Sequence, residues 1–174
     1  MLTLAHSSAH AAEGIEIAQA HLESTEEGYK LSATFAFELN HELENAIVHG
    51  VPLYFKTDIE LNRPRWYWFD ERAVSTSQTI RISYNVFTRQ YNASITGGLQ
   101  QSFSTLDDAL SLVRRPSRWV VAEPGTLKAG QTYHVSMRME LDPKHFSKPF
   151  QVHAINNSDW RLSSDWISFS FKAE

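Results

Sequence analysis

Hydrophobic and polar residues alternate along most of this chain with a period of two. The pattern is clearest over residues 30–39, where the odd positions are apolar and most of the even positions are polar. Successive side chains of a β-strand point to opposite faces, so each such segment predicts a strand with one buried and one solvent-facing side. The pattern recurs over 51–62, 80–86, 133–141 and 167–172, and weaker forms cover 14–23, 89–96 and 149–155.

Two segments have the spacing of a helix instead. Thr105 and Asp108 resemble a capping box, apolar residues follow at helical intervals, and Pro116 ends the segment. The second predicted helix runs from Asn40, a favourable N-cap residue, to the residue before Gly50. Both helices are expected to be short.

Many alternating strands and few helices favour antiparallel sheets, since parallel sheets need long apolar runs and crossover helices. The chain has 174 residues and no Pro/Gly-rich linker, which is typical of one domain. We therefore predict a mainly β protein, a single-domain antiparallel β-sandwich of immunoglobulin-like general architecture with one or two short helices. The domain is predicted over 13–174, after a signal-peptide remnant or disordered tail at 1–12.

Composition narrows the chemistry. The chain has no cysteine, which excludes disulfides, thiolate catalysis and cysteine-ligated zinc, and its net charge of -4 argues against a nucleic-acid partner. The eight histidines show no metal-binding spacing outside the N-terminal tail, and no nucleophile or phosphate-binding motif occurs. Asp70 and Glu71 are adjacent, so in a strand they would point to opposite faces and could not act as an acid/base pair. We predict no catalytic residue, no metal and no cofactor.

The N-terminus suggests export. Ala9-His10-Ala11 fits the small-x-small pattern of a signal-peptide cleavage site, which predicts a periplasmic protein. A disordered cytosolic tail is the alternative explanation. No stretch of the chain approaches the roughly 20 apolar residues of a membrane span, so no transmembrane segment is predicted.

A run of four aromatic residues between arginines and an acid is the strongest candidate for a site. In a strand, Trp66 and Trp68 would face one way, and Tyr67 and Phe69 the other. One pair would enter the core, while the other pair and nearby arginines would form either a structural ladder or a binding platform. A pocket that also includes Arg89 and Tyr91 would favour a small ligand, and a flat patch would favour a protein. The candidate binding residues are Arg65, Trp66, Tyr67, Trp68, Phe69, Arg89 and Tyr91.

Two further tryptophans, Trp160 and Trp166, flank a polar bend near the C-terminus. Each is predicted to be either a plug against the end of the sandwich or an exposed contact.

Several segments together resemble the family called domain of unknown function 4390. They are VPLYF at 51–55, RPRWYWFD at 63–70, RISYNVFTRQY at 81–91, GLQQSF at 98–103, LDDAL at 106–110, KPFQV at 148–152 and DWRLSSDW at 159–166. The resemblance implies an exported proteobacterial protein whose gene often lies beside a membrane sensor kinase of the nitrogen-regulation type. It implies no activity or substrate.

The expected function is non-enzymatic binding in the periplasm. The expected partner is the extracytoplasmic region of a sensor kinase or another envelope protein. The alternative is a module that binds a small molecule or glycan on an aromatic/arginine platform. An enzyme that uses carboxylates is the third possibility.

Overall fold

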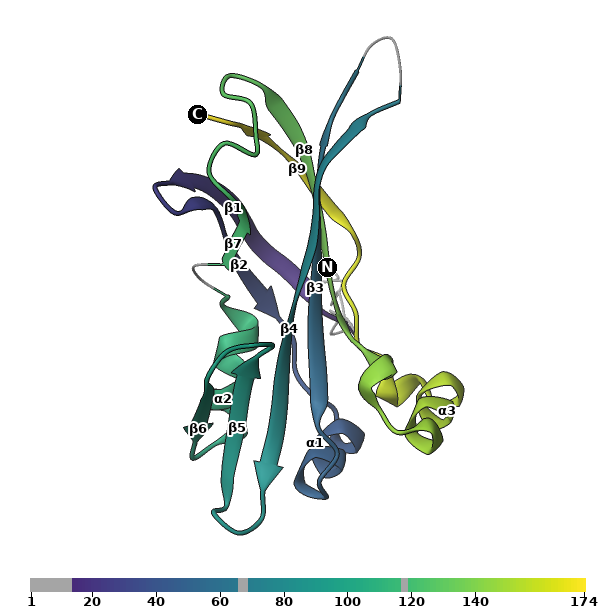
Figure 1. The fold of residues 1–174 in the computed structure, drawn as a ribbon. Helices are drawn as coiled ribbons and strands as arrows, with labels where there is room; N and C mark the ends of the chain where they lie inside the picture. The colour runs from purple at the N-terminus through teal and green to yellow at the C-terminus, as the bar shows by residue number, and fades with distance from the viewer. Residues whose placement is uncertain (1–13, 66–68, 117–118) are drawn as a thin grey trace, which may run out of the picture.

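The structure is a computed structural model that describes residues 14–65, 69–116 and 119–174 (Figure 1). These residues form a three-stranded and a six-stranded sheet, and every strand pairing is antiparallel. The smaller sheet has the order β1 (Glu16–Thr25), β2 (Gly28–Ala36), β7 (Trp119–Ala122). The larger has the order β6 (Gln100–Phe103), β5 (Gln90–Ile95), β4 (Glu71–Asn85), β3 (Leu53–Arg63), β8 (Thr132–Leu141), β9 (Ile167–Lys172). The prediction of a mainly β antiparallel sandwich is confirmed.

Both predicted helices are present with their predicted caps. In α1 (His41–Val48) the side chain of Asn40 accepts a hydrogen bond from the backbone N–H of Leu43. In α2 (Leu106–Arg114) the Thr105 hydroxyl accepts one from the N–H of Asp108. These bonds satisfy backbone donors that the first helical turn leaves without a partner.

Strand β3 lies at the centre of the larger sheet, between β4 and β8. Its odd-numbered residues are buried from Leu53 to Leu61, while the even-numbered residues between them are half-exposed on the outer face. The smaller sheet covers the part of the larger sheet formed by β8 and β9, and α2 contacts β5 and β6 farther along (Figure 1). The core therefore lies between the two sheets and continues between the larger sheet and α2.

A glycine is required at the start of β2, where this strand lies against β7. Gly28 starts β2 with a φ of 125°, and a Cβ atom at this position would lie 2.3 Å from the carbonyl oxygen of Ala122. Any side chain would therefore clash with β7 and would also strain the backbone. The close approach of β7 to β2 depends on this residue.

The weak strand predicted over 149–155 is wrong, because this segment is a third helix, α3 (Lys148–Asn156). Pro149 lies in its first turn, where the missing N–H of proline is tolerated. Only Ala154 of this helix is buried, so the apolar residues that suggested a strand do not mark a buried sheet face. The helix stands out to the side of the sheets, between the short 3-10 helices η1 (Pro143–His145) and η2 (Ser158–Trp160) (Figure 1).

The aromatic run was predicted as part of a strand, and the described residues at its two ends contradict this. β3 ends at Arg63 and β4 begins at Glu71, so Pro64, Arg65, Phe69 and Asp70 belong to the connection of a hairpin. Proline has no N–H to donate to the strand ladder, which explains why pairing stops there. Trp66, Tyr67 and Trp68, and the predicted division of their faces, lie outside the described residues.

A matched pair of phenylalanines tests the assignment of the core. Phe55 is 1% exposed and its ring stacks on Phe37 at 5.4 Å between centroids, whereas Phe87 is 95% exposed. Phe55→Ala should lower the free energy of unfolding by about 3–5 kcal/mol in urea denaturation, because it leaves a cavity. Phe87→Ala should change the free energy of unfolding by less than about 0.5 kcal/mol. Similar losses for the two variants would contradict the described packing.

Candidate binding site

Charged residues join the two strands at the end of the β3–β4 hairpin. Arg63 and Arg65 both form ion pairs with the same carboxylate oxygen of Glu71, and the Arg65 Nη2 to Glu71 Oε2 distance is 2.8 Å. The hydrogen bond from Arg65, reinforced by the charge of Arg63, lowers the pKa of Glu71 below its usual value. Glu71 is therefore ionised at neutral pH. From the start of β4 it holds Arg63, at the end of β3, and Arg65, in the loop between the strands.

Phe69 lies two residues before Glu71, in the same hairpin connection, and is 82% exposed. An exposed phenylalanine ring does not contribute to folding stability the free energy that its burial would provide. Aromatic residues and arginines are also the residues that most often dominate the energy of protein–protein interfaces. The described part of the predicted platform, Arg65 and Phe69, therefore combines an exposed ring with an arginine that is paired to Glu71.

The other two candidate residues, Arg89 and Tyr91, lie at the opposite end of β4. This strand has 15 residues, which corresponds to roughly 45 Å at about 3.3 Å per residue. Arg89 has a φ of 54° in the turn before β5, and the ring of Tyr91 lies 4.9 Å from that of Tyr84. The structure therefore does not combine Arg65 and Phe69 with Arg89 and Tyr91 in one pocket.

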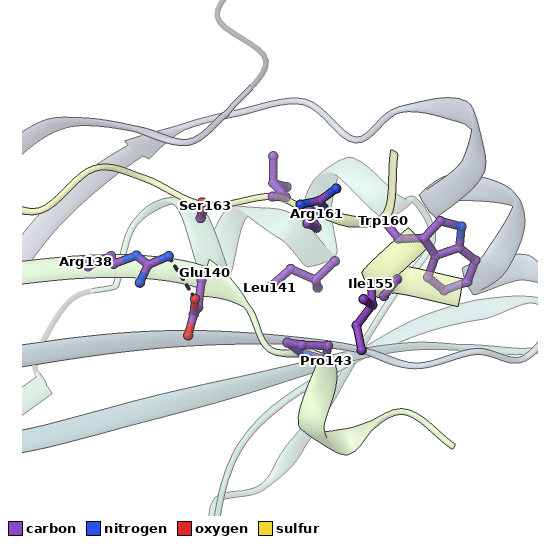
Figure 2. Close-up of a pocket in the computed structure, with 10 residues that line it drawn as sticks. Arg138, Glu140, Leu141, Pro143, Ile155, Trp160, Arg161 and Ser163 are labelled. Carbon is purple, nitrogen blue, oxygen red and sulfur yellow. Dashed lines mark ion pairs between the residues drawn. The ribbon is translucent and has the colours of Figure 1, made fainter. Parts of the chain in front are cut away.

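An apolar cleft that the sequence did not predict lies between the end of β8, α3 and η2 (Figure 2). Its volume is about 300 Å³, and Leu141, Pro143 and Ile155 line it. Arg138 and Glu140 form an ion pair of 3.1 Å at its edge, drawn as a dashed line in Figure 2. Its lining comes from β8, from α3 and from the segment after α3, and for this reason the local sequence pattern gave no sign of it.

Trp160 forms one wall of this cleft and is the plug that the sequence allowed. Its side chain is 6% exposed, stacks on Phe150 at 5.6 Å, and meets Phe146 and His153 edge-on. Its indole N–H has no hydrogen-bond partner among the described residues. The ring therefore stabilises the α3 region through packing alone.

The described residues contain no group of three or more histidine or acidic side chains arranged to hold a metal ion. No helix formed by the described residues is both long and apolar enough to cross a membrane.

The fold and the exposed hairpin define an antiparallel β-sandwich protein with exposed aromatic residues at the ends of its longest strands. The chain belongs to the family described as domain of unknown function DUF4390, whose sequence model matches residues 12–170. This match confirms the family resemblance. Neither the curated proteins nor the solved structures include a significant match to the chain.

The charge cluster predicts a distinct titration of Glu71. Because its pKa in the folded protein is lowered, the ion pairs are complete above the usual pKa of 4.5 and are lost as the pH falls through the lower, folded value. A carboxyl-detected NMR titration should therefore give Glu71 a midpoint below 4.5. Arg65→Gln should move this midpoint upward, and an unchanged midpoint would contradict the principal role of Arg65.

The buried indole predicts unequal effects of two substitutions at Trp160. Trp160→Ala should destabilise the protein by about 3–5 kcal/mol, because it removes the buried ring on which Phe150 and His153 of α3 pack. Trp160→Phe should cost much less, since it keeps an aromatic ring and removes a buried donor that makes no hydrogen bond. Thermal unfolding of both variants checks this, and an equally large loss in Trp160→Phe would indicate an essential role for the N–H.

Proposed function

We propose that this protein is a non-enzymatic periplasmic binding protein that recognises a protein partner through the end of its β3–β4 hairpin. The observation that carries the proposal is the 82% exposed ring of Phe69, close in the chain to the Arg63, Arg65 and Glu71 cluster. A partner that covers this ring would gain the free energy of apolar burial. The arginines would supply directional polar contacts around it.

The arrangement of the hairpin supports this role. β3 and β4 pair from Leu53 with Ile82 to Arg63 with Glu71, with one shift of register between Leu61 and Asn62, so the charge cluster stands on two long paired strands. The hairpin leads away from α1 and α3 to the opposite end of the molecule, where none of the described helices covers it (Figure 1). A surface held in this way loses little conformational entropy when it binds.

Family membership and the N-terminal sequence support the compartment and the partner. The Ala9-His10-Ala11 pattern and the resemblance to exported proteobacterial proteins favour the periplasm. The family resemblance implies a gene neighbourhood that includes a membrane sensor kinase, so the extracytoplasmic region of such a kinase is the first partner to test. Another envelope protein is the alternative partner.

The state of Glu71 supports binding over acid/base catalysis at this end of the molecule. Efficient proton transfer calls for a group whose pKa lies near the working pH. The arginines instead move the pKa of Glu71 farther below neutrality. The carboxylate is suited to hold the arginines in place and not to exchange a proton.

The test is a binding measurement between the full chain and the purified extracytoplasmic region of a nitrogen-regulation-type sensor kinase from the same organism. Phe69→Ala should weaken binding by tenfold or more, as expected for an aromatic residue at the centre of an interface. Phe87→Ala is the matched control, because Phe87 is also largely exposed, at 95%, but lies at the far end of β4. Equal affinity of the two variants, or no binding of the kinase region by the wild-type chain, would reject the proposal.

A further inference from the structure

We propose that the outer face of the six-stranded sheet binds an uncharged saccharide, with Trp166 as the surface on which a sugar ring stacks. This face is separate from the hairpin end, and the inference does not depend on the proposed protein partner. It rests on a groove of about 300 Å³ lined by one tryptophan and by carboxylate and hydroxyl side chains. This volume is at the lower end of the range of roughly 300–1,000 Å³ for small-molecule sites.

The strand register places the polar side chains of the groove in two neighbouring rows across the sheet. In one row Asp58 of β3 lies between Arg138 of β8 and Ser77 of β4. In the next row Glu60 lies between Ser136 and Ser75, and Ser168 of β9 pairs with Ser136. Ile59, between the two acids, is fully buried, so both carboxylates must point to the outer face.

Trp166 lies at the β9 end of the first row and is 50% exposed. It directly precedes Ile167, which pairs with Met137, so it falls next to Arg138 in the antiparallel register. It lines the same groove as Asp58 and Ser77. An indole ring therefore borders a sheet surface that is otherwise composed of charged and hydroxyl groups.

The backbone around Trp166 is fixed on both sides. The buried Ser164 donates its N–H to the carbonyl of Met139 at 2.8 Å, and its hydroxyl accepts from the N–H of Met139 at 3.0 Å. The same hydroxyl donates to the carbonyl of Asp165 at 2.8 Å. The pairing of β9 with β8 begins one residue after Trp166. The ring is thus presented by an ordered backbone, which reduces the entropy lost when a ligand binds.

The combination of groups fits a saccharide. One face of a pyranose ring carries C–H groups that can lie on an indole ring, while its hydroxyls both donate and accept hydrogen bonds. Asp58 and Glu60 can accept such bonds, and Ser75 and Ser77 can both donate and accept them. The groove thus offers an apolar surface and polar partners on adjacent strands.

Charge favours an uncharged ligand. Lys56 pairs with Asp58 at 3.0 Å, and Arg72 lies 3.9 Å from Glu60, so each carboxylate in the groove already has a cation beside it. Arg138, beside Asp58 in the register, is likewise paired with Glu140. These ion pairs leave the groove no surplus positive charge to hold an acidic sugar, so such a sugar should bind more weakly than an uncharged one. A protein partner lying on this face would have to desolvate the same charged groups, which is costly without matched partners.

The test is isothermal titration calorimetry of the full chain with cellotriose, maltotriose and N,N′,N″-triacetylchitotriose, and with trigalacturonate as the anionic comparison. At least one uncharged trisaccharide should bind, and trigalacturonate should bind at least tenfold more weakly. Trp166→Ala should weaken the binding of that trisaccharide by tenfold or more, and Trp166→Phe should retain part of the affinity. Asp58→Asn should weaken it as well, because the amide is a poorer acceptor.

Phe87→Ala serves as the control for loss of an exposed ring and should bind the sugar as the wild type does. Unchanged circular dichroism and melting temperature of Trp166→Ala would exclude a loss through misfolding, which is not expected for a half-exposed side chain. The proposal is overturned if none of the three uncharged sugars binds, if Trp166→Ala binds as tightly as the wild type, or if trigalacturonate binds best. Phe69→Ala should leave sugar binding intact, so this experiment and the kinase-binding experiment can fail independently.

Discussion

The pairing of β3 with a strand on each side is the constraint on which the rest of the structure depends. β4 and β8 fix its register from both edges, and this register sends Phe55 and Ile59 into the core and Asp58 and Glu60 to the outer face. A slip of one residue would exchange the two sets, burying carboxylates and exposing apolar side chains. Both candidate surfaces depend on this one strand. The polar groove lies on its outer face, and the hairpin that carries Phe69 begins at its C-terminal end.

The segment after β8 shows how strongly local anchoring decides the role of a side chain. Trp160 and Trp166 have similar polar neighbours in the sequence, yet one fills the space beneath α3 and the other is half-exposed. Ser164 lies between them and is bonded to Met139 through both its backbone and its hydroxyl. The chain is thereby tied to β8 between the two tryptophans. The α3 insertion closes over the first ring, and the return to the sheet leaves the second ring beside the outer face.

The alternation of apolar and polar residues was sufficient to predict the strands with one buried face, such as β3 and β8, and Asn40 and Thr105 were sufficient to predict where two helices begin. The alternation pattern did not predict strands in which buried and exposed residues do not alternate. The first half of β4 is half-exposed along much of its length, so its sequence looks like a loop, and β6 and β7 have only four residues each. The separation of Arg89 from Arg65 follows from the full length of β4. The groove beside Trp166 depends on the register of four strands, which no local pattern contains.

The contact between β7 and Gly28 has a consequence for the order in which the chain can fold. β3 to β6 form successive hairpins between neighbours in sequence, whereas the smaller sheet is completed only when β7 reaches β2 from far along the chain. The hydrogen bond from the Tyr29 hydroxyl to the carbonyl of Leu127 closes a sequence separation of 98 residues at the same place. Closing so long a loop costs entropy before it gains contacts, and such topologies fold slowly. The β1–β2 hairpin is the first part of the sandwich to be synthesised, and β7, which pairs with it, is made much later. Its apolar face is therefore exposed to solvent, and accessible to chaperones, while most of the chain is made.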